Sequence, residues 1–185
     1  MIGYAFCGSF CSFAESFTQF SRLIDEGREL IPIMSENAYL TDTRFFEAKE
    51  FVLAVEKKAG RPVVHSITES EKFGQNRLDT LVISPCTGNT LAKIANGITD
   101  TAVTMAAKAH LRCDGKLLIA LASNDAMSQN LKNIAPLLTR KSVYFVPMRQ
   151  DNPIGKPHSL VADFSKVPEA LGAMEKDIQL RPIFV

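Results

Sequence analysis

Continuous apolar runs alternate along the chain with segments whose apolar residues recur every three or four positions. The runs predict strands at residues 2–6, 29–34, 62–67, 80–83, 116–122 and 142–146. The helical spacing predicts helices at 13–24, 41–58, 91–98, 100–112, 126–138 and 167–175. Strands that alternate with helices in this way are typical of a parallel sheet covered by helices on both faces.

The chain is expected to form one domain over residues 1–185. That length is enough for a substantial core, and neither a repeat nor a low-complexity linker divides it. We predict a three-layer, Rossmann-like (flavodoxin-like) α/β fold. Prolines are frequent after residue 146, so residues 147–185 are predicted to include an extended arm, centred on 151–159, that lies over the surface.

The stretch 79–100, DTLVISPCTGNTLAKIANGITD, is expected to be central to the fold. Its apolar run predicts a strand that Pro85 ends, and its last part has helical spacing. The small polar residues between the two parts lie where ligands bind in open α/β sheets. Hydroxyl groups, an amide and the N–H groups of a helix start suit a phosphate or a carboxylate.

Small polar residues follow three further predicted strands, at 8–9, 35–37 and 123–125. Because parallel strands end at the same edge of a sheet, we expect these loops to converge on one ligand site. The same residues could instead be helix caps or Asx-type turns. The residues expected to line the site are Gly8, Ser9, Ser35, Asn37, Pro85, Thr87, Gly88, Asn89, Thr90, Ser123 and Asn124.

The composition narrows the range of partners. Charged residues are balanced, with 21 Lys and Arg against 20 Asp and Glu, so neither nucleic acid nor an anionic membrane is an expected partner. The N-terminus lacks the features of a signal peptide, and the four cysteines form neither a CxxC pair nor a zinc-type pattern. We therefore expect free thiols, a cytoplasmic location and no metal site.

The central stretch closely resembles the signature of the flavoprotein family, which includes flavin-containing cysteine decarboxylases and flavin prenyltransferases. The matching positions are Pro85, Thr87, Asn89, Thr90, Lys93, Ala95, Gly97 and Asp100, with Cys86 in place of the usual alanine. Gly8 and Ser9 match the family's first loop, which contacts the flavin phosphate. The resemblance therefore implies an FMN site in the converging loops and assembly as a homo-oligomer, a trimer or a multiple of one.

Two other stretches, TDTRFFEAKEF (41–51) and YFVPMRQDNPIGKPHSLVAD (144–163), resemble one branch of that family, the dipicolinate synthase B subunits. This resemblance implies action during sporulation with an A subunit that carries NAD(P). Together the two subunits would oxidise dihydrodipicolinate to dipicolinate. Asn89 and Arg44 are the candidate catalytic residues, and Lys93, Arg149, Lys156 and His158 are further cations that could contact the dicarboxylate.

The sequence departs from the cysteine decarboxylases at two points. Residues 41–58 contain no histidine, and no cysteine follows Cys113. Their decarboxylation mechanism is therefore not expected here. The FMN itself could also have been lost, because a phosphate-binding loop can persist after use of the cofactor ends. Two alternatives stay open: an independent FMN-dependent decarboxylase or prenyltransferase-like enzyme, and a non-catalytic subunit that binds an anion. Cys86 could be a reactive thiol at a helix start, but packing as a small apolar residue is the favoured interpretation.

Overall fold

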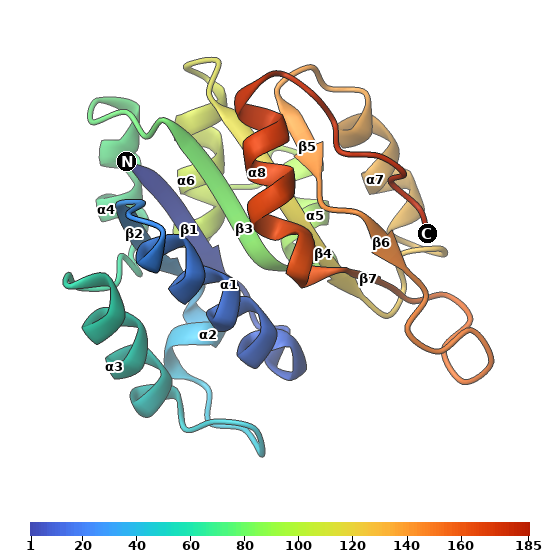
Figure 1. The fold of residues 1–185 in the computed structure, drawn as a ribbon, viewed down its shortest axis with the longest axis horizontal. Helices are drawn as coiled ribbons and strands as arrows, with labels where there is room; N and C mark the ends of the chain where they lie inside the picture. Colours follow the sequence, from blue (N-terminus) through green and yellow to red (C-terminus); the bar gives the residue numbers. More distant parts are fainter.

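The computed structural model describes residues 1–185 and contains one seven-stranded sheet (Figure 1). In spatial order the strands are β2 (Leu30–Met34), β1 (Ile2–Phe6), β3 (Thr80–Thr87), β4 (Lys116–Ser123), β7 (Leu160–Ala162) and β6 (Met148–Arg149), with β5 (Val143–Phe145) also paired to β4. Strands β2, β1, β3, β4 and β5 are parallel, whereas β7 runs antiparallel to β4 and β6 antiparallel to β7.

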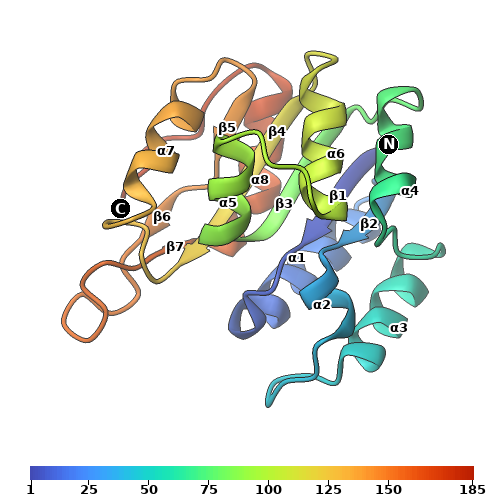
Figure 2. The same ribbon diagram turned by 180° about the vertical axis from the view of Figure 1, so that it is seen from behind.

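Helices cover both faces of this sheet, which confirms the predicted three-layer α/β fold (Figures 1 and 2). One face carries α1 (Phe13–Asp25), α3 (Ala48–Ala59) and α8 (Val167–Glu175). The other face carries α4 (Ile67–Glu71), α5 (Gly88–Ala95), α6 (Ala102–Leu111) and α7 (Leu131–Leu138). The short α2 (Glu36–Leu40) follows β2, and 3-10 turns occupy Phe10–Ser12, Lys72–Gly74 and Phe164–Lys166.

Burial on both sides explains why the central strands are continuously apolar. Successive residues of β4 alternate between the two cores: Leu118 packs with the α1, α3 and α8 side, and Leu117 and Ile119 pack with the α6 and α7 side. Residues of β1 alternate in the same way, because Tyr4 packs in the core under α1, α3 and α8 and Ala5 packs in the core on the opposite face. A strand covered on both faces needs no polar alternation, so the apolar runs predicted these strands correctly.

Two of the predicted strands differ from those observed. Residues 62–67 form no strand, and only Val64 makes a bridge, to Ile33 of β2. Strand β3 does not end before Pro85 but continues to Thr87, with a register shift against β4 between Ile83 and Cys86. Proline has no N–H to donate to a sheet, and an irregularity in the pairing accommodates it.

The helix predicted at 41–58 begins later, at Ala48. Asp42 lies in the loop before this helix, and its carboxylate accepts from the Ala48 N–H of the first turn at 2.8 Å. Phe45 lies in the same loop and is 45% exposed. The helix expected at 91–98 runs instead from Gly88 to Ala95, and the helix expected at 126–138 begins at Leu131.

The predicted surface arm is in part a component of the sheet. Strands β6 and β7 form an antiparallel pair that lies beside the carboxyl end of β4, and the β6–β7 loop (150–159) projects from the body (Figure 1). The sheet is thus mostly parallel, as predicted, but 142–146 is not its last strand, because β6 and β7 add an antiparallel edge. No helix in the structure combines the length and apolar character needed to cross a membrane.

Candidate functional site

A pocket of about 1150 Å³ opens at the carboxyl edge of the sheet, where β1, β3 and β4 end. Three of the four converging loops line it, together with the loop before α3, the start of α7 and the β6–β7 loop. Its walls include the following residues that the sequence singled out: Gly8, Ser9, Arg44, Thr87, Gly88, Asn89, Ser123, Asn124 and Lys156.

The fourth loop lines a separate, smaller hollow of about 370 Å³. The two hollows share Gly8, Thr87 and Asn89, while Ser35, Asn37 and Thr90 face only the smaller one. There Lys93 is paired with Asp100 at 2.8 Å, an interaction that lowers the pKa of Asp100, and Glu36 adds a second carboxylate. With two carboxylates and one ammonium group, this hollow suits an anion less well than the larger pocket does.

Several of the singled-out residues also have local structural roles. Ser35 caps α2 by accepting from the Ala38 N–H at 3.4 Å, and Thr87 caps α5 by accepting from the Thr90 N–H at 3.2 Å. Pro85 is buried inside β3 and lines neither hollow. The helix-cap interpretation therefore holds for Ser35 and Thr87, although Thr87 still borders the larger pocket.

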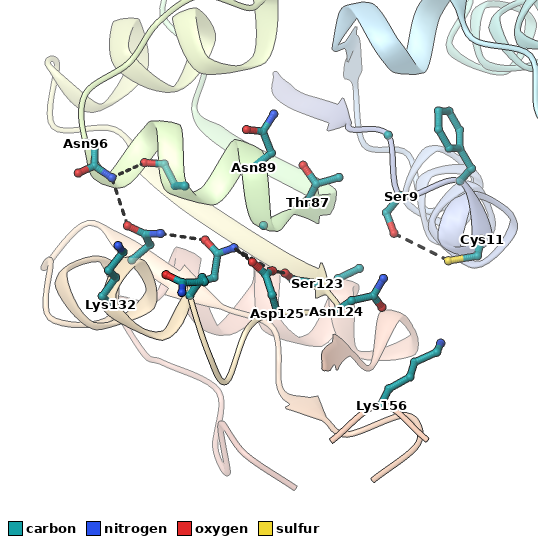
Figure 3. A pocket seen from close by; sticks show the side chains of 18 of the residues that line it. Ser9, Cys11, Thr87, Asn89, Asn96, Ser123, Asn124, Asp125, Lys132 and Lys156 are labelled. Atoms are coloured by element: carbon teal, nitrogen blue, oxygen red, sulfur yellow. Dashed lines mark hydrogen bonds between the residues drawn. The ribbon is translucent and has the colours of Figure 1, made fainter. Parts of the chain in front are cut away.

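A chain of hydrogen-bonded side chains forms one wall of the pocket (Figure 3). Ser123 Oγ donates to Asp125 Oδ1 at 2.5 Å, and Asn130 Nδ2 donates to both Asp125 oxygens at 2.9 Å. Asn133 Nδ2 then donates to Asn130 Oδ1 at 2.9 Å, and Asn96 Nδ2 donates to Asn133 Oδ1 at 3.2 Å. The wall thus links the ends of β4 and α5 to α7.

This asparagine wall was not predicted from the sequence. Asn130 and Asn133 are buried despite their polarity, and they lie three positions apart, so they share one face of the start of α7. That spacing in the segment SQNLKN was the available signal. Asn96 could not have been found in the same way, because it comes from the far end of α5.

The wall holds Asp125 as a carboxylate. The hydrogen bond from Ser123 is the largest cause that lowers the pKa of Asp125, and the bonds from Asn130 act in the same direction, while partial burial opposes them. The carboxylate sits next to the first turn of α5, because a β-carbon built on Gly88 would lie 3.0 Å from Asp125 Oδ1. Asp125 is therefore a fixed acceptor near the β4 end of the wall.

Three cationic side chains reach this pocket from three separate segments. Arg44 lies over the Phe45 ring at 4.8 Å, Lys132 is on α7, and Lys156 is on the β6–β7 loop, where it pairs with Asp151 at 3.0 Å. Asp125 is the one carboxylate among the lining residues, so the pocket carries a net positive charge. Three other predicted cations, Lys93, Arg149 and His158, do not line it.

The cysteines near the site differ in accessibility. Burial raises the pKa of Cys7 to about 11 and the pKa of Cys86 well above its usual value. Both thiols lie in the core below the pocket, so Cys86 packs as a small apolar residue, in agreement with the favoured interpretation. Cys11 is exposed and lines the pocket beside Ser9.

The sequence model of the flavoprotein family matches residues 2–176, nearly the whole chain. The chain belongs to the flavoprotein family. Within this family it is homologous to the B subunit of dipicolinate synthase from Bacillus subtilis (strain 168), with 37% identity over 185 residues, which cover all of this chain and 92% of that protein. The predicted family and branch are thereby confirmed.

Solved structures agree with this assignment to the flavoprotein family. The crystal structure of the dipicolinate synthase B subunit from Bacillus halodurans C is 37% identical, with a TM-score of 0.91 over all of this chain and 95% of that one. An FMN-dependent cysteine decarboxylase, SpaF, is 21% identical with a TM-score of 0.70, and 95% of each chain is covered. At that lower identity the likeness to SpaF supports the shared fold alone.

Proposed function

We propose that this chain is the B subunit of a dipicolinate synthase, that it binds FMN in the larger pocket and that it acts with a nicotinamide-dependent A subunit. In the reaction a dihydrodipicolinate loses a hydride and a proton to become the aromatic dicarboxylate. The observation that carries the proposal is the pocket itself. It joins the β1, β3 and β4 loops of the flavoprotein signature to a set of cations, in a chain that is 37% identical to a B subunit along its full length.

The residues of the pocket fit a flavin nucleotide. Ser9, Thr87 and Asn124 are polar groups at strand ends beside the start of α5, and Lys156 adds a positive charge, so a phosphate would be held at this end. Phe10 and Phe45 provide apolar surface that a planar ring could cover. The volume of about 1150 Å³ leaves space for a small acid in addition.

FMN, when bound, supplies a group that can accept two electrons from a substrate and pass them on. The chain's own residues would bind the flavin and orient the substrate. The Asp125 carboxylate, fixed by Ser123 and Asn130, would accept hydrogen bonds from hydroxyl groups of the ribityl chain. Asn89 at the start of α5 would orient the substrate or the ring edge, and Arg44 would attract the anionic acid. These are the roles that we propose for the two candidate catalytic residues.

An independent decarboxylase is the second candidate, because FMN-dependent decarboxylases share this fold. Against it, neither α2 nor α3 contains a histidine, and no cysteine follows Cys113. A subunit that binds an anion without taking part in electron transfer is the third candidate. The proposal also includes a homo-oligomer, which is supported by the dodecameric state named for an Escherichia coli O157:H7 FMN-dependent decarboxylase of this fold.

Activity of the reconstituted pair tests the proposal. The chain and its A subunit should be assayed for dipicolinate formation separately and together, each with and without FMN and NAD(P). We expect turnover only when both chains are present and a clear increase on addition of FMN. Turnover by the A subunit alone at the same rate would refute a catalytic contribution of this chain. FMN-independent turnover by the pair would favour the third candidate.

A further inference from the structure

Lys132 is a pocket cation whose charge has no partner within the protein. It is the second residue of α7 and lines the pocket, yet none of the nine ion pairs of the structure includes it. Figure 3 shows Lys132 and Asn96 at one end of the pocket, and Ser9 and Lys156 at the other. The pocket thus has two cationic ends.

Between the two ends lies a negative charge. Asp125 is held as a carboxylate by Ser123 and Asn130, and Figure 3 shows it between Lys132 and Lys156. The Asp125 carboxylate repels a ligand anion from this part of the pocket, whereas the cation at either end attracts it. Two separate anionic groups, one at each end, therefore fit this charge pattern better than one group at its centre.

The neighbour of Lys132 supplies a fixed hydrogen-bond donor. Asn133 is only 8% exposed, and its amide is held from both sides, since Nδ2 donates to Asn130 and Oδ1 accepts from Asn96. An amide nitrogen carries two hydrogens, and the second one on Asn133 has no acceptor within the protein. Because Asn133 bonds to Asn96, it lines the same end of the pocket as Lys132.

We propose that Lys132 and Asn133 form the position that binds a carboxylate of the substrate, separate from the phosphate end at Ser9 and Lys156. This inference rests on the proposed function, in which both FMN and a small dicarboxylate occupy the pocket. A carboxylate accepts two hydrogen bonds side by side, which suits one ammonium group and one amide hydrogen. The FMN phosphate is the other anion that could occupy this end, and the experiment separates the two.

The test compares two titrations on the same variants of the full chain. Lys132→Ala removes the cation, Lys132→Arg keeps the charge, and Lys141→Ala removes an exposed lysine that does not line the pocket. Calorimetry measures binding of pyridine-2,6-dicarboxylate and of the monocarboxylate pyridine-2-carboxylate, and flavin fluorescence measures binding of FMN. Lys132 is exposed, so its loss should not prevent folding.

We expect Lys132→Ala to weaken dicarboxylate binding about fivefold, the upper range for one solvent-accessible ion pair, and to leave FMN binding unchanged. Lys132→Arg and Lys141→Ala should bind the dicarboxylate like the unaltered chain. The inference is overturned if the dicarboxylate does not bind to the unaltered chain, if Lys132→Ala binds it normally, or if Lys132→Ala weakens FMN instead.

A result that contradicts the proposed function differs from one that contradicts the role of Lys132. A chain that takes up no FMN in any variant contradicts the cofactor assignment. The dicarboxylate titrations on that flavin-free chain still decide the role of Lys132, because they need no flavin. The two results can therefore be read independently.

Discussion

Gly88, the first residue of α5, lies directly against Asp125 at the end of β4. A β-carbon at position 88 would lie 3.0 Å from Asp125 Oδ1, 2.6 Å from Asn130 Nδ2 and closer still to Ser123 Oγ. Contacts that short cannot be made without displacing those atoms. The close approach of α5 to the polar wall therefore depends on the absence of a side chain at Gly88.

Gly88→Ala should disturb the wall and weaken FMN binding about tenfold or more, which corresponds to roughly 1.4 kcal/mol. The physical reason is that Ser123, Asp125 and Asn130 bond to one another, so displacing one of them moves the others. A fluorescence titration of FMN measures the change. Gly172→Ala in α8 is the matched control, because nothing lies within 4 Å of its added β-carbon, and it should bind FMN normally. Equal affinities of the two variants would show that the wall does not shape the site.

Asp125→Asn should reduce stability at neutral pH by about 1 to 3 kcal/mol, because Asn130 loses a charged acceptor. Folding lowers the pKa of Asp125, mainly through the Ser123 hydrogen bond. The Asp125 carboxylate therefore stabilises the fold fully when the pH is above the pKa of an unfolded aspartate, about 4. This stabilisation is lost as the pH falls from that value through the lower pKa of Asp125 in the folded protein.

Urea unfolding of both proteins between neutral pH and about pH 3 measures this difference. The two free energies of unfolding should converge as the pH falls below about 4, since protonation removes the charge in the unaltered protein. Taking the difference cancels the other carboxylates whose pKa is lowered, such as Asp100 and Asp151. A constant difference across the range would mean that the Asp125 charge does not stabilise the wall.

Arg44→Ala should lower dipicolinate formation by the assembled enzyme about threefold to fivefold without changing its melting temperature. Arg44 is exposed, lies over the Phe45 ring and has no carboxylate partner among the ion pairs, so it contributes little to the fold. Arg77→Ala, at an exposed position outside the pocket, provides the control. If both variants turn over like the unaltered enzyme, Arg44 does not contact the substrate.

The rate of thiol labelling should distinguish the buried cysteines from the exposed ones. Burial raises the pKa of Cys7 to about 11 and raises that of Cys86 as well, so both remain protonated near neutral pH and unreactive in the native protein. Cys11 is exposed and should label first, and Cys113 is partly exposed and should follow. Cys11→Ser should remove the fast phase and no other. Rapid native labelling of Cys86, identified by peptide mass, would contradict its placement in the core.

The alternation of strands and helices could be predicted because each central strand is buried on both faces. Residues 117–122 are apolar at every position for that reason, and the structure confirms β4 there. Strands β6 and β7 could not be predicted in this way, since they contain two and three residues. They exist because they pair with each other and with the distant end of β4, a contact that no local pattern records.

The candidate site was predictable only in part, for a similar reason. The loops after β1, β3 and β4 end at one edge because the strands are parallel, and this geometry follows from the fold class. The separation of Ser35 and Asn37 into a second hollow depends on the position of α2 and on the Lys93–Asp100 pair. The asparagine wall joins the end of α5 to α7, and the sequence does not show that these two segments are in contact. The complete wall could therefore not be predicted from the sequence.

The most direct test of the central claim compares FMN with riboflavin, which lacks the phosphate. Both should be titrated into the purified chain while flavin fluorescence is followed. We predict saturable binding of FMN and affinity for riboflavin that is weaker by about tenfold or more, since the phosphate loses its charged and hydroxyl partners at the Ser9 and Lys156 end of the pocket. Absence of saturable FMN binding, or equal affinity for the two flavins, would contradict a flavin phosphate site in this pocket.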